Sequence, residues 1–205
     1  MPGTLYIVAA PSGAGKTSLT RALLERDPDM VLSVSYTSRA PRPNEIDGVH
    51  YHFVTRAEFE AMAARGEFFE HAVVHGDLKG TSRKIVEQTL ASGRDMLLEI
   101  DWQGARIVRA QMPEAVSIFI LPPSRVELER RLRTRASDSE ATIQRRLGDA
   151  QQDLQHAAEF DYIVVNENFD AALAELCEIV EARREGCELP RMRHAALLAE
   201  LLEQR

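Results

Sequence analysis

The stretch AAPSGAGKTS, residues 9–18, has the residue types and spacing of a loop that binds phosphate groups. Small residues let backbone amides approach an anion, and a helix behind the loop would add its dipole. Lys16 could contact the β and γ phosphates of ATP, and the Thr17 hydroxyl could bind Mg²⁺. The residues expected to bind ATP in this loop are Ala10, Pro11, Ser12, Gly13, Ala14, Gly15, Lys16 and Thr17.

One position departs from the pattern G-x-x-x-x-G-K-[ST], because Ala10 stands where the first glycine is usual. An alanine costs nothing there if its φ angle is negative. The alternative is a glycine-rich turn that has no ligand.

Asp101 ends the apolar stretch DMLLEID, residues 95–101. A carboxylate at the end of a buried strand commonly holds the hydration shell of Mg²⁺, so Asp101 and Thr17 are the candidate metal residues. The alternative is a carboxylate that caps a helix beginning near Gln103, and the two roles are compatible. Together with the loop, these residues indicate an ATP-using phosphotransferase or NTPase.

Short apolar runs alternate with helical patterns along most of the chain. The expected strands cover residues 4–10, 95–101, 116–122 and 162–166. The expected helices cover residues 16–26, 82–92, 103–112, 125–135, 139–158 and 170–184. Strands separated by helices predict an α/β fold with a parallel sheet, and such sheets bind ligands at the carboxyl ends of their strands. The Pro11–Lys16 turn would lie at that edge.

Residues 35–90 interrupt this alternation. Turn signals and alternating residues around Tyr51 predict small antiparallel strands, as in an inserted subdomain. Arg39 and Arg42, three residues apart, could grip one phosphate, and Glu70 could read a base. Two loop arginines can equally be solvated.

Composition limits the remaining classes of function. The 205 residues carry a net charge of −7, which gives no support to a general role in binding nucleic acid. No apolar run approaches the roughly 20 residues of a membrane span, and no signal peptide is recognisable. Cys177 and Cys187 are expected to be free thiols, so we expect a cytoplasmic protein. The amphipathic tail after Leu189 could pack on the body of the protein or on a second copy.

The chain resembles the guanylate kinases. APSGAGKTS, SVSYTSRAPRP, DGVHYHFV, GEFFEHA, GTS, LEIDWQGA, IFILPPS and DYIVVNE appear in the order and spacing of that family, over about residues 4–185. The resemblance implies a P-loop NTPase-type parallel sheet flanked by helices, with a small α+β GMP-binding insertion and a helical lid. It also implies the reaction of ATP with GMP (or dGMP) to give ADP and GDP with Mg²⁺, in purine nucleotide metabolism.

By resemblance, Arg39, Arg42 and Tyr51 contact the GMP phosphate. The residues that the resemblance assigns to guanine are Ser35, Glu70, Thr81 and Asp101. Chemistry supports Glu70, because guanine presents adjacent N1–H and N2–H₂ donors that one carboxylate can accept. Adenine presents an acceptor at N1, and a buried mismatch of this kind discriminates by about 1–3 kcal/mol. A Thr81 hydroxyl that donates to O6 would sharpen the choice.

The resemblance also explains an arginine-rich segment, with arginines at positions 125, 130, 131, 133, 135, 145 and 146. It selects Arg131, Arg135 and Arg146 as lid residues that act with Lys16 on the transferred phosphoryl group. Arg125, Arg130 and Arg133 are expected on solvated helix faces. The acceptor is already an anion, so catalysis needs positioning and electrostatics and no general base. Asn166 resembles the family residue near the adenine of ATP.

The chain departs from the family at two positions. GDLKGTS, residues 76–82, has Lys79 where the family has a tyrosine whose hydroxyl contacts the GMP phosphate. A lysine could make that contact with a full charge, or point to solvent. Ala136 follows Arg135 where glycine is usual, and would stiffen or distort a lid hinge or helix end.

The resemblance divides the chain into a P-loop core, a GMP-binding subdomain, a lid and a C-terminal helix. The core is expected to hold residues 1–34, 84–124 and 159–190, and the GMP-binding subdomain residues 35–83. The lid is expected at residues 125–158 and the C-terminal helix at residues 191–205. One alternative is a guanylate-kinase-like interaction module without chemistry, although such modules typically lose the phosphate loop. Another is a P-loop kinase with a different small acceptor, which Glu70 and Thr81 oppose and Lys79 leaves open.

Overall fold

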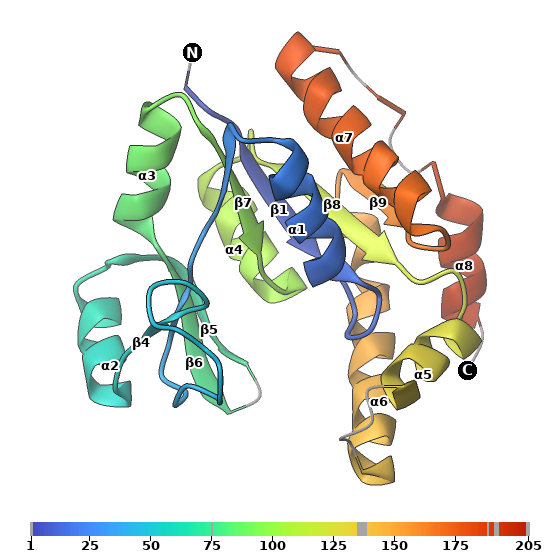
Figure 1. Ribbon diagram of the computed structural model, residues 1–205, viewed down its shortest axis with the longest axis horizontal. Helices are drawn as coiled ribbons and strands as arrows, with labels where there is room; N and C mark the ends of the chain where they lie inside the picture. Colours follow the sequence, from blue (N-terminus) through green and yellow to red (C-terminus); the bar gives the residue numbers. More distant parts are fainter. Residues whose placement is uncertain (1, 75, 135–138, 188, 191–192, 204–205) are drawn as a thin grey trace. The chain divides into compact units, whose positions relative to one another are not determined.

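The stretch predicted to bind phosphate lies between a buried strand and a helix (Figure 1). The structure is a computed structural model that describes residues 2–74, 76–134, 139–187, 189–190 and 193–203. β1 (Leu5–Ala9) is buried along its whole length, as its unbroken apolar sequence predicts. α1 (Lys16–Arg26) begins at the lysine of the loop and ends before Asp27-Pro28, where proline cannot continue a helix.

A five-stranded sheet has the strand order β2-β7-β1-β8-β9. Its other strands are β2 (Met30–Leu32), β7 (Asp95–Glu99), β8 (Val116–Leu121) and β9 (Tyr162–Val165). β2 pairs in parallel with β7, and β8 pairs in parallel with β9. The expected parallel α/β class is therefore confirmed. β2 was not expected, because three residues are too few to show a pattern in the sequence.

The chain folds into two compact units, each built from two segments. The first unit holds residues 1–6 and 29–115, and the second holds residues 7–28 and 116–205. Each unit has its own buried residues.

The first unit contains a four-stranded sheet of order β4-β3-β6-β5. The strands of this sheet are β3 (Tyr36–Thr37), β4 (His52–Phe53), β5 (Phe68–Val74) and β6 (Asp77–Ser82). The helices of the first unit are α2 (Arg56–Ala64), α3 (Arg83–Ala91) and α4 (Trp102–Gln111). Phe59 on α2 packs with Phe68 and Leu78 to form the core behind the sheet. Hence the inserted segment has a small core of its own.

Two expectations for this segment need correction. β6 pairs antiparallel with β3 and β5 as expected, but β3 and β4 pair in parallel. The connection between β3 and β4 turns at Asn44 and Gly48, both with positive φ, and it returns the chain in the direction of β3. α2 was not expected at all, although Thr55 and Glu58 form a complete capping box at its start.

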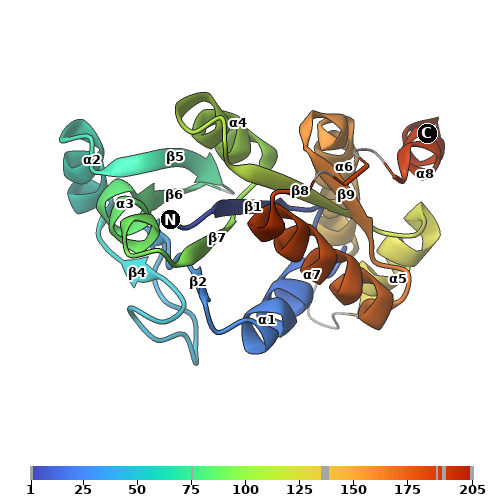
Figure 2. The same ribbon diagram turned by 90° about the horizontal axis from the view of Figure 1, so that it is seen from above.

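The second unit carries most of the helices. They are α1, α5 (Arg125–Thr134), α6 (Glu140–Gln155), a short 3₁₀ helix (Ala157–Glu159), α7 (Phe169–Glu185) and α8 (Ala195–Glu203). α1 and α7 lie side by side in both ribbon views (Figure 2). α5 and α6 share a cluster of Leu128, Leu132, Leu147 and Ala150. The expected helices are therefore present, with ends that differ by a few residues.

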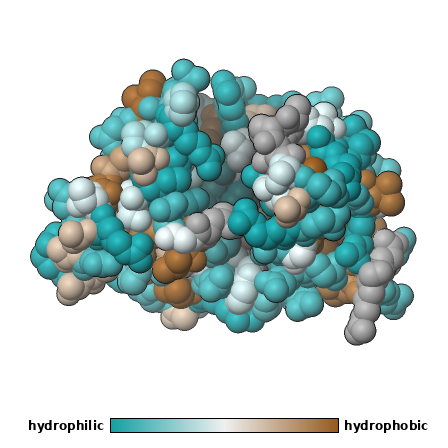
Figure 3. Space-filling model, turned by 90° about the horizontal axis from the view of Figure 1, so that it is seen from below, coloured by the Kyte–Doolittle hydropathy of each residue, from teal (hydrophilic) through white to brown (hydrophobic). Residues whose placement is uncertain are grey.

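The surface agrees with the charged composition of the chain. The face drawn in Figure 3 is mostly hydrophilic, with scattered apolar residues. None of the described helices combines the length and the apolar character that crossing a bilayer would take.

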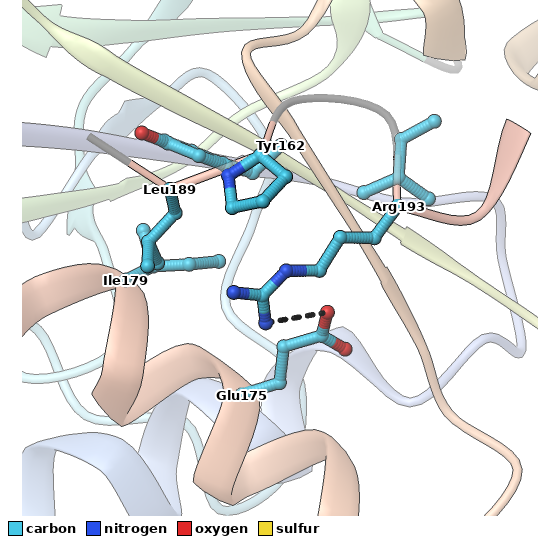
Figure 4. A pocket seen from close by; sticks show the side chains of 7 residues that line it. Tyr162, Glu175, Ile179, Leu189 and Arg193 are labelled. Atoms are coloured by element: carbon cyan, nitrogen blue, oxygen red, sulfur yellow. Dashed lines mark ion pairs between the residues drawn. The ribbon is translucent and has the colours of Figure 1, made fainter. Parts of the chain in front are cut away.

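The C-terminal tail packs on α7 within the second unit. Arg193 pairs with Glu175 at 3.9 Å (Figure 4). Arg193 also pairs with Glu178 at 2.6 Å, and Glu175 is 3.1 Å from His194. A small pocket lies beside these pairs, between Tyr162, Ile163, Ile179, Leu189 and Pro190. α8 then packs against α6 through its buried face, which includes Leu198 and Leu201. The tail therefore joins α7 to α6.

Candidate functional site

The loop before α1 is shaped for an anion. Gly13 and Gly15 have φ angles of 93° and 96°, which residues with a side chain rarely adopt. Among the described residues no side chain caps the start of α1, and its first turn holds no acidic residue. The amides of that turn and the positive end of the helix dipole are thus suited to phosphate oxygens. The arrangement fits the triphosphate that the sequence predicts.

Ala10 is compatible with this loop. Asn44 is the one non-glycine residue with a positive φ angle in the described chain, so Ala10 keeps an ordinary backbone. The missing first glycine therefore costs no backbone strain.

The inner side of the loop is tightly packed. A Cβ atom added at Gly13 would lie 3.1 Å from side-chain atoms of both Leu128 and Leu132 on α5. A Cβ atom added at Gly15 would overlap the side-chain amide of Asn166. The glycines are needed for space as well as for φ, because α5 and Asn166 occupy the volume behind them.

Asn166 contacts the loop directly. Its Nδ2 donates to the Ala14 carbonyl oxygen at 2.8 Å, and its side chain is buried. Its backbone carbonyl accepts from Nη2 of Arg131 at 2.9 Å. The structure thus brings together three predicted residues, Ala14, Arg131 and Asn166.

Arg131, the first of the predicted lid arginines, is held by two acceptors. Its Nε donates to Glu127 at 2.7 Å, in addition to the bond with the Asn166 carbonyl. Arg130 and Arg131 together hold the pKa of the Glu127 carboxyl at about 2, with Arg130 the larger contributor. Glu127 was not predicted as a site residue, although its i, i+4 spacing to Arg131 is a recognisable signal.

The other predicted lid residues are Arg135 and Arg146. Arg146 is half-buried on α6. Arg135 and Ala136 lie outside the described residues. Arg133 pairs with Glu129 at 2.8 Å and with Glu140 at 2.6 Å on exposed faces, as expected for an arginine without a catalytic role.

The first unit holds a buried carboxyl group at Glu70, whose exposed fraction is 6%. The Thr81 hydroxyl donates to its Oε1 at 2.7 Å. Burial raises the pKa of Glu70 to about 7, with a smaller rise from the Asp101 charge and an opposing effect of Thr81. Because a hydroxyl has one proton, the Thr81 bond to Glu70 uses the proton that was expected to reach guanine O6.

Gly104 and Asp101 lie beside this carboxyl group. Asp101 caps α4 by accepting from the Gly104 amide at 2.9 Å, so the capping role considered for Asp101 is present. A Cβ atom added at Gly104 would lie 3.2 Å from Glu70 Oε2. Gly104 was not predicted, because its closeness to Glu70 appears only when β5 and α4 are packed.

A second cluster gathers cations around Tyr51. The Arg39 guanidinium lies 5.6 Å from the centre of the Tyr51 ring, and Lys79 Nζ lies 5.4 Å from it. Arg39 also pairs with Glu45 at 2.8 Å. Arg39, followed by the Arg42 backbone amide, holds the pKa of Glu45 at about 2. Lys79 thus lies next to Tyr51, one of the residues predicted to contact the GMP phosphate.

The remaining predicted residues of this unit are Arg42 and Ser35. Arg42 is exposed and contributes its backbone amide to Glu45. Ser35 precedes β3, and its carbonyl oxygen accepts from the His52 amide at 2.9 Å. Glu45 was not predicted, and no spacing in the sequence singles it out.

The residues predicted for ATP and for GMP fall in different units, whereas the predicted metal pair is divided, with Thr17 in the second unit and Asp101 in the first. All those expected to contact ATP lie in the second unit, together with Arg131 and Arg146. All those expected to contact GMP lie in the first unit, and Asp101 is among them. Each unit therefore carries one candidate anion-binding region.

Comparison with known proteins gives one consistent result. The family model described as guanylate kinase matches residues 2–183. The guanylate kinase of Xanthomonas oryzae pv. oryzae (strain MAFF 311018) is 56% identical over 203 residues, which cover 99% of this chain and 100% of that protein. The guanylate kinase of Xylella fastidiosa (strain Temecula1) is 54% identical over 202 residues, 98% of this chain and 99% of that protein. The crystal structure of guanylate kinase from Anaplasma phagocytophilum superposes with a TM-score of 0.74 at 34% identity, covering 97% of this chain and 94% of that one.

Proposed function

The chain belongs to the guanylate kinase family, and from this premise we propose how its residues phosphorylate GMP with ATP. The reaction moves the γ-phosphoryl group of ATP to a phosphate oxygen of GMP (or dGMP) and gives GDP (or dGDP) and ADP. The observation that carries the choice of acceptor is the buried Glu70 carboxyl group with its Thr81 hydrogen bond.

Glu70 would select guanine through its two oxygens. An ionised Glu70 can accept from N1–H and N2–H₂ of guanine, whereas adenine would leave a buried carboxylate facing a lone pair. Thr81 would act by fixing the carboxylate, since its hydroxyl already donates to Oε1. Ser35 and Asp101 complete the proposed guanine contacts.

The GMP phosphate would be held by Arg39, Arg42, Tyr51 and Lys79. Support comes from the two cations that lie around the Tyr51 ring in the first unit. Glu45 keeps the Arg39 guanidinium in place before a phosphate arrives, and so lowers the entropy lost on binding. Lys79 would supply as a charge what the family tyrosine supplies as a hydroxyl.

On the ATP side, backbone amides of Ser12–Thr17 would surround the phosphates, and Lys16 would contact their β and γ oxygens. The Thr17 hydroxyl and the Asp101 carboxylate are the oxygen ligands proposed for Mg²⁺, and both are of the kind that this ion prefers. When bound, Mg²⁺ neutralises charge on the phosphates. Arg131, Arg135 and Arg146 would stabilise the negative charge of the phosphoryl group in transfer.

We also propose that different segments of the chain have different functions. Residues 35–83 would bind GMP, residues 125–158 would form the arginine-bearing lid, and residues 1–34, 84–124 and 159–190 would form the core. Residues 191–205 would form the C-terminal helix.

A coupled assay of ADP release tests the acceptor, with GMP, dGMP, AMP, CMP and UMP compared at equal concentrations. We expect turnover with GMP and dGMP, and less than about 1% of that rate with AMP. Adenine lacks both guanine donors, N1–H and N2–H₂, and each hydrogen bond that the buried Glu70 carboxylate loses costs about 1–3 kcal/mol. Absence of turnover with GMP would refute the proposed reaction. Equal turnover with AMP would refute the role of Glu70.

Lys16→Ala tests the phosphate loop separately. The variant should lose turnover by at least about a hundredfold while calorimetry shows unchanged binding of GMP, because Lys16 and the GMP residues lie in different units. Near-normal kcat in this variant would contradict the assignment of the loop.

A further inference from the structure

Asn166 makes three hydrogen bonds to three separate parts of the second unit. Its backbone amide donates to the Leu121 carbonyl at 2.9 Å, at the end of β8. Its side-chain Nδ2 donates to the Ala14 carbonyl at 2.8 Å, in the phosphate loop. Its own carbonyl accepts from Arg131 at 2.9 Å, on α5. One residue thus links the sheet, the loop and the first lid arginine.

The side-chain bond of Asn166 is buried and is closely fitted to the loop. Asn166 is 6% exposed and Ala14 is fully buried. The Asn166 amide fills the space in which a side chain at position 15 would stand. A buried carbonyl without a donor costs about 1–3 kcal/mol, so the Ala14 carbonyl would favour another loop shape if Asn166 were lost.

We infer that Asn166 is a positioning residue that holds the phosphate loop in its anion-binding shape through Ala14, and not a residue that reads adenine. Its effect reaches the phosphates through the backbone amides of the loop. Its carbonyl also fixes Arg131, so the loop and a proposed catalytic arginine share one anchor. The link to ATP turnover rests on the proposed function, whereas the effect on phosphate binding does not.

The test separates the phosphates from the base. Binding of ATP and of inorganic tripolyphosphate, which has no base, is measured by calorimetry for the wild type, Asn166→Ala and Asn166→Leu. ADP competition confirms that tripolyphosphate occupies the loop. We expect both variants to bind ATP and tripolyphosphate about tenfold more weakly, by the same factor for the two ligands. The leucine variant keeps the side-chain volume and removes the donor, which guards against an effect of a cavity.

Asn168→Ala is the matched control. Asn168 caps α7 by accepting from the Ala171 amide at 3.0 Å, two residues from Asn166 and on the surface. It should lower the melting temperature without weakening tripolyphosphate binding. An unchanged circular dichroism spectrum and a single cooperative thermal transition in all variants show that the protein is folded.

Two results would overturn the inference. Weaker binding of ATP with unchanged binding of tripolyphosphate would mean that Asn166 contacts adenine. Unchanged binding of both ligands would mean that the Ala14 bond does not shape the loop. A wild type that binds tripolyphosphate but does not phosphorylate GMP would instead refute the proposed function and leave this inference standing.

Discussion

At the scale of single residues, the proposed role of Glu70 would couple guanine binding to a proton. Its pKa of about 7 in the folded protein means that it is protonated below neutral pH, whereas guanine requires its ionised form. Binding must therefore release a proton at low pH, and affinity falls as pH falls. We expect the KM for GMP to rise about tenfold from pH 8 to pH 6, from a single proton with this pKa.

Glu70→Gln is the comparison for that prediction. Glutamine cannot ionise, so the variant should have a higher KM for GMP that changes less between pH 6 and pH 8. Titration of the GMP phosphate affects both proteins and cancels in the ratio of their KM values. An identical pH profile for the two proteins would contradict the role of Glu70.

Gly104 is expected to affect GMP binding as well, because the absence of a side chain there leaves room for the Glu70 carboxyl group. In Gly104→Ala the new methyl group would stand 3.2 Å from Oε2, so the carboxyl group must shift. We expect the KM for GMP to rise several-fold, measured by steady-state kinetics, with little change in the KM for ATP.

Gly148→Ala provides the control for Gly104→Ala. Gly148 lies in α6 with open space around its Cβ position. Alanine there should stabilise the helix by about 1 kcal/mol in urea unfolding, with no change in the KM for GMP. An unchanged KM for GMP in Gly104→Ala would show that Glu70 tolerates the methyl group.

At the scale of elements, α5 supports the phosphate loop. Leu132 is fully buried, and it and Leu128 lie directly behind Gly13. Leu132→Ala should lower the free energy of unfolding by about 2–5 kcal/mol and raise the KM for ATP more than the KM for GMP. Urea denaturation and kinetics with each substrate varied in turn would measure both effects.

A second core leucine distinguishes general destabilisation from loss of this support. Leu201 on α8 is also buried, and α8 packs against α6. Leu201→Ala should cost a similar free energy of unfolding while the ratio of the two KM values stays that of the wild type. The same change of ratio in both variants would argue against a special role of α5.

The elements also show what local sequence patterns can predict. α1 was predicted at Lys16–Arg26, because the loop motif marks its start and Asp27-Pro28 its end. α2 was missed although its Thr55–Glu58 capping box is local and readable. The parallel pairing of β3 with β4 depends on the path of a long connection, which no local pattern encodes.

At the scale of the whole molecule, the two substrates should protect different parts of the chain. GMP should slow amide exchange in β5 and β6 of the first unit, and ATP should slow it around Ala14 and α5 of the second. Hydrogen exchange measured with each ligand alone would show this. Glu70→Gln should lose most of the protection by GMP and keep the protection by ATP. Protection of the loop by GMP alone would contradict the assignment.

Long-range contacts mark the limit of sequence reasoning about the site. Family resemblance and residue chemistry pointed to both Glu70 and Thr81. They did not predict that the Thr81 hydroxyl binds the Glu70 carboxyl group. Asn166 was nominated as a residue near adenine, and its bond to Ala14 spans 152 positions. Such pairs depend on how several elements pack together, so no spacing within one segment reveals them.

That separation of 152 positions has a consequence for synthesis on the ribosome. At about 5–20 residues per second, Asn166 emerges roughly 8–30 seconds after Ala14. Leu128 and Leu132, which also support the loop, emerge late as well. The first unit ends at Ala115 and can fold before these partners exist, so the nascent chain can hold a finished first unit while the loop of the second unit has yet to acquire its shape.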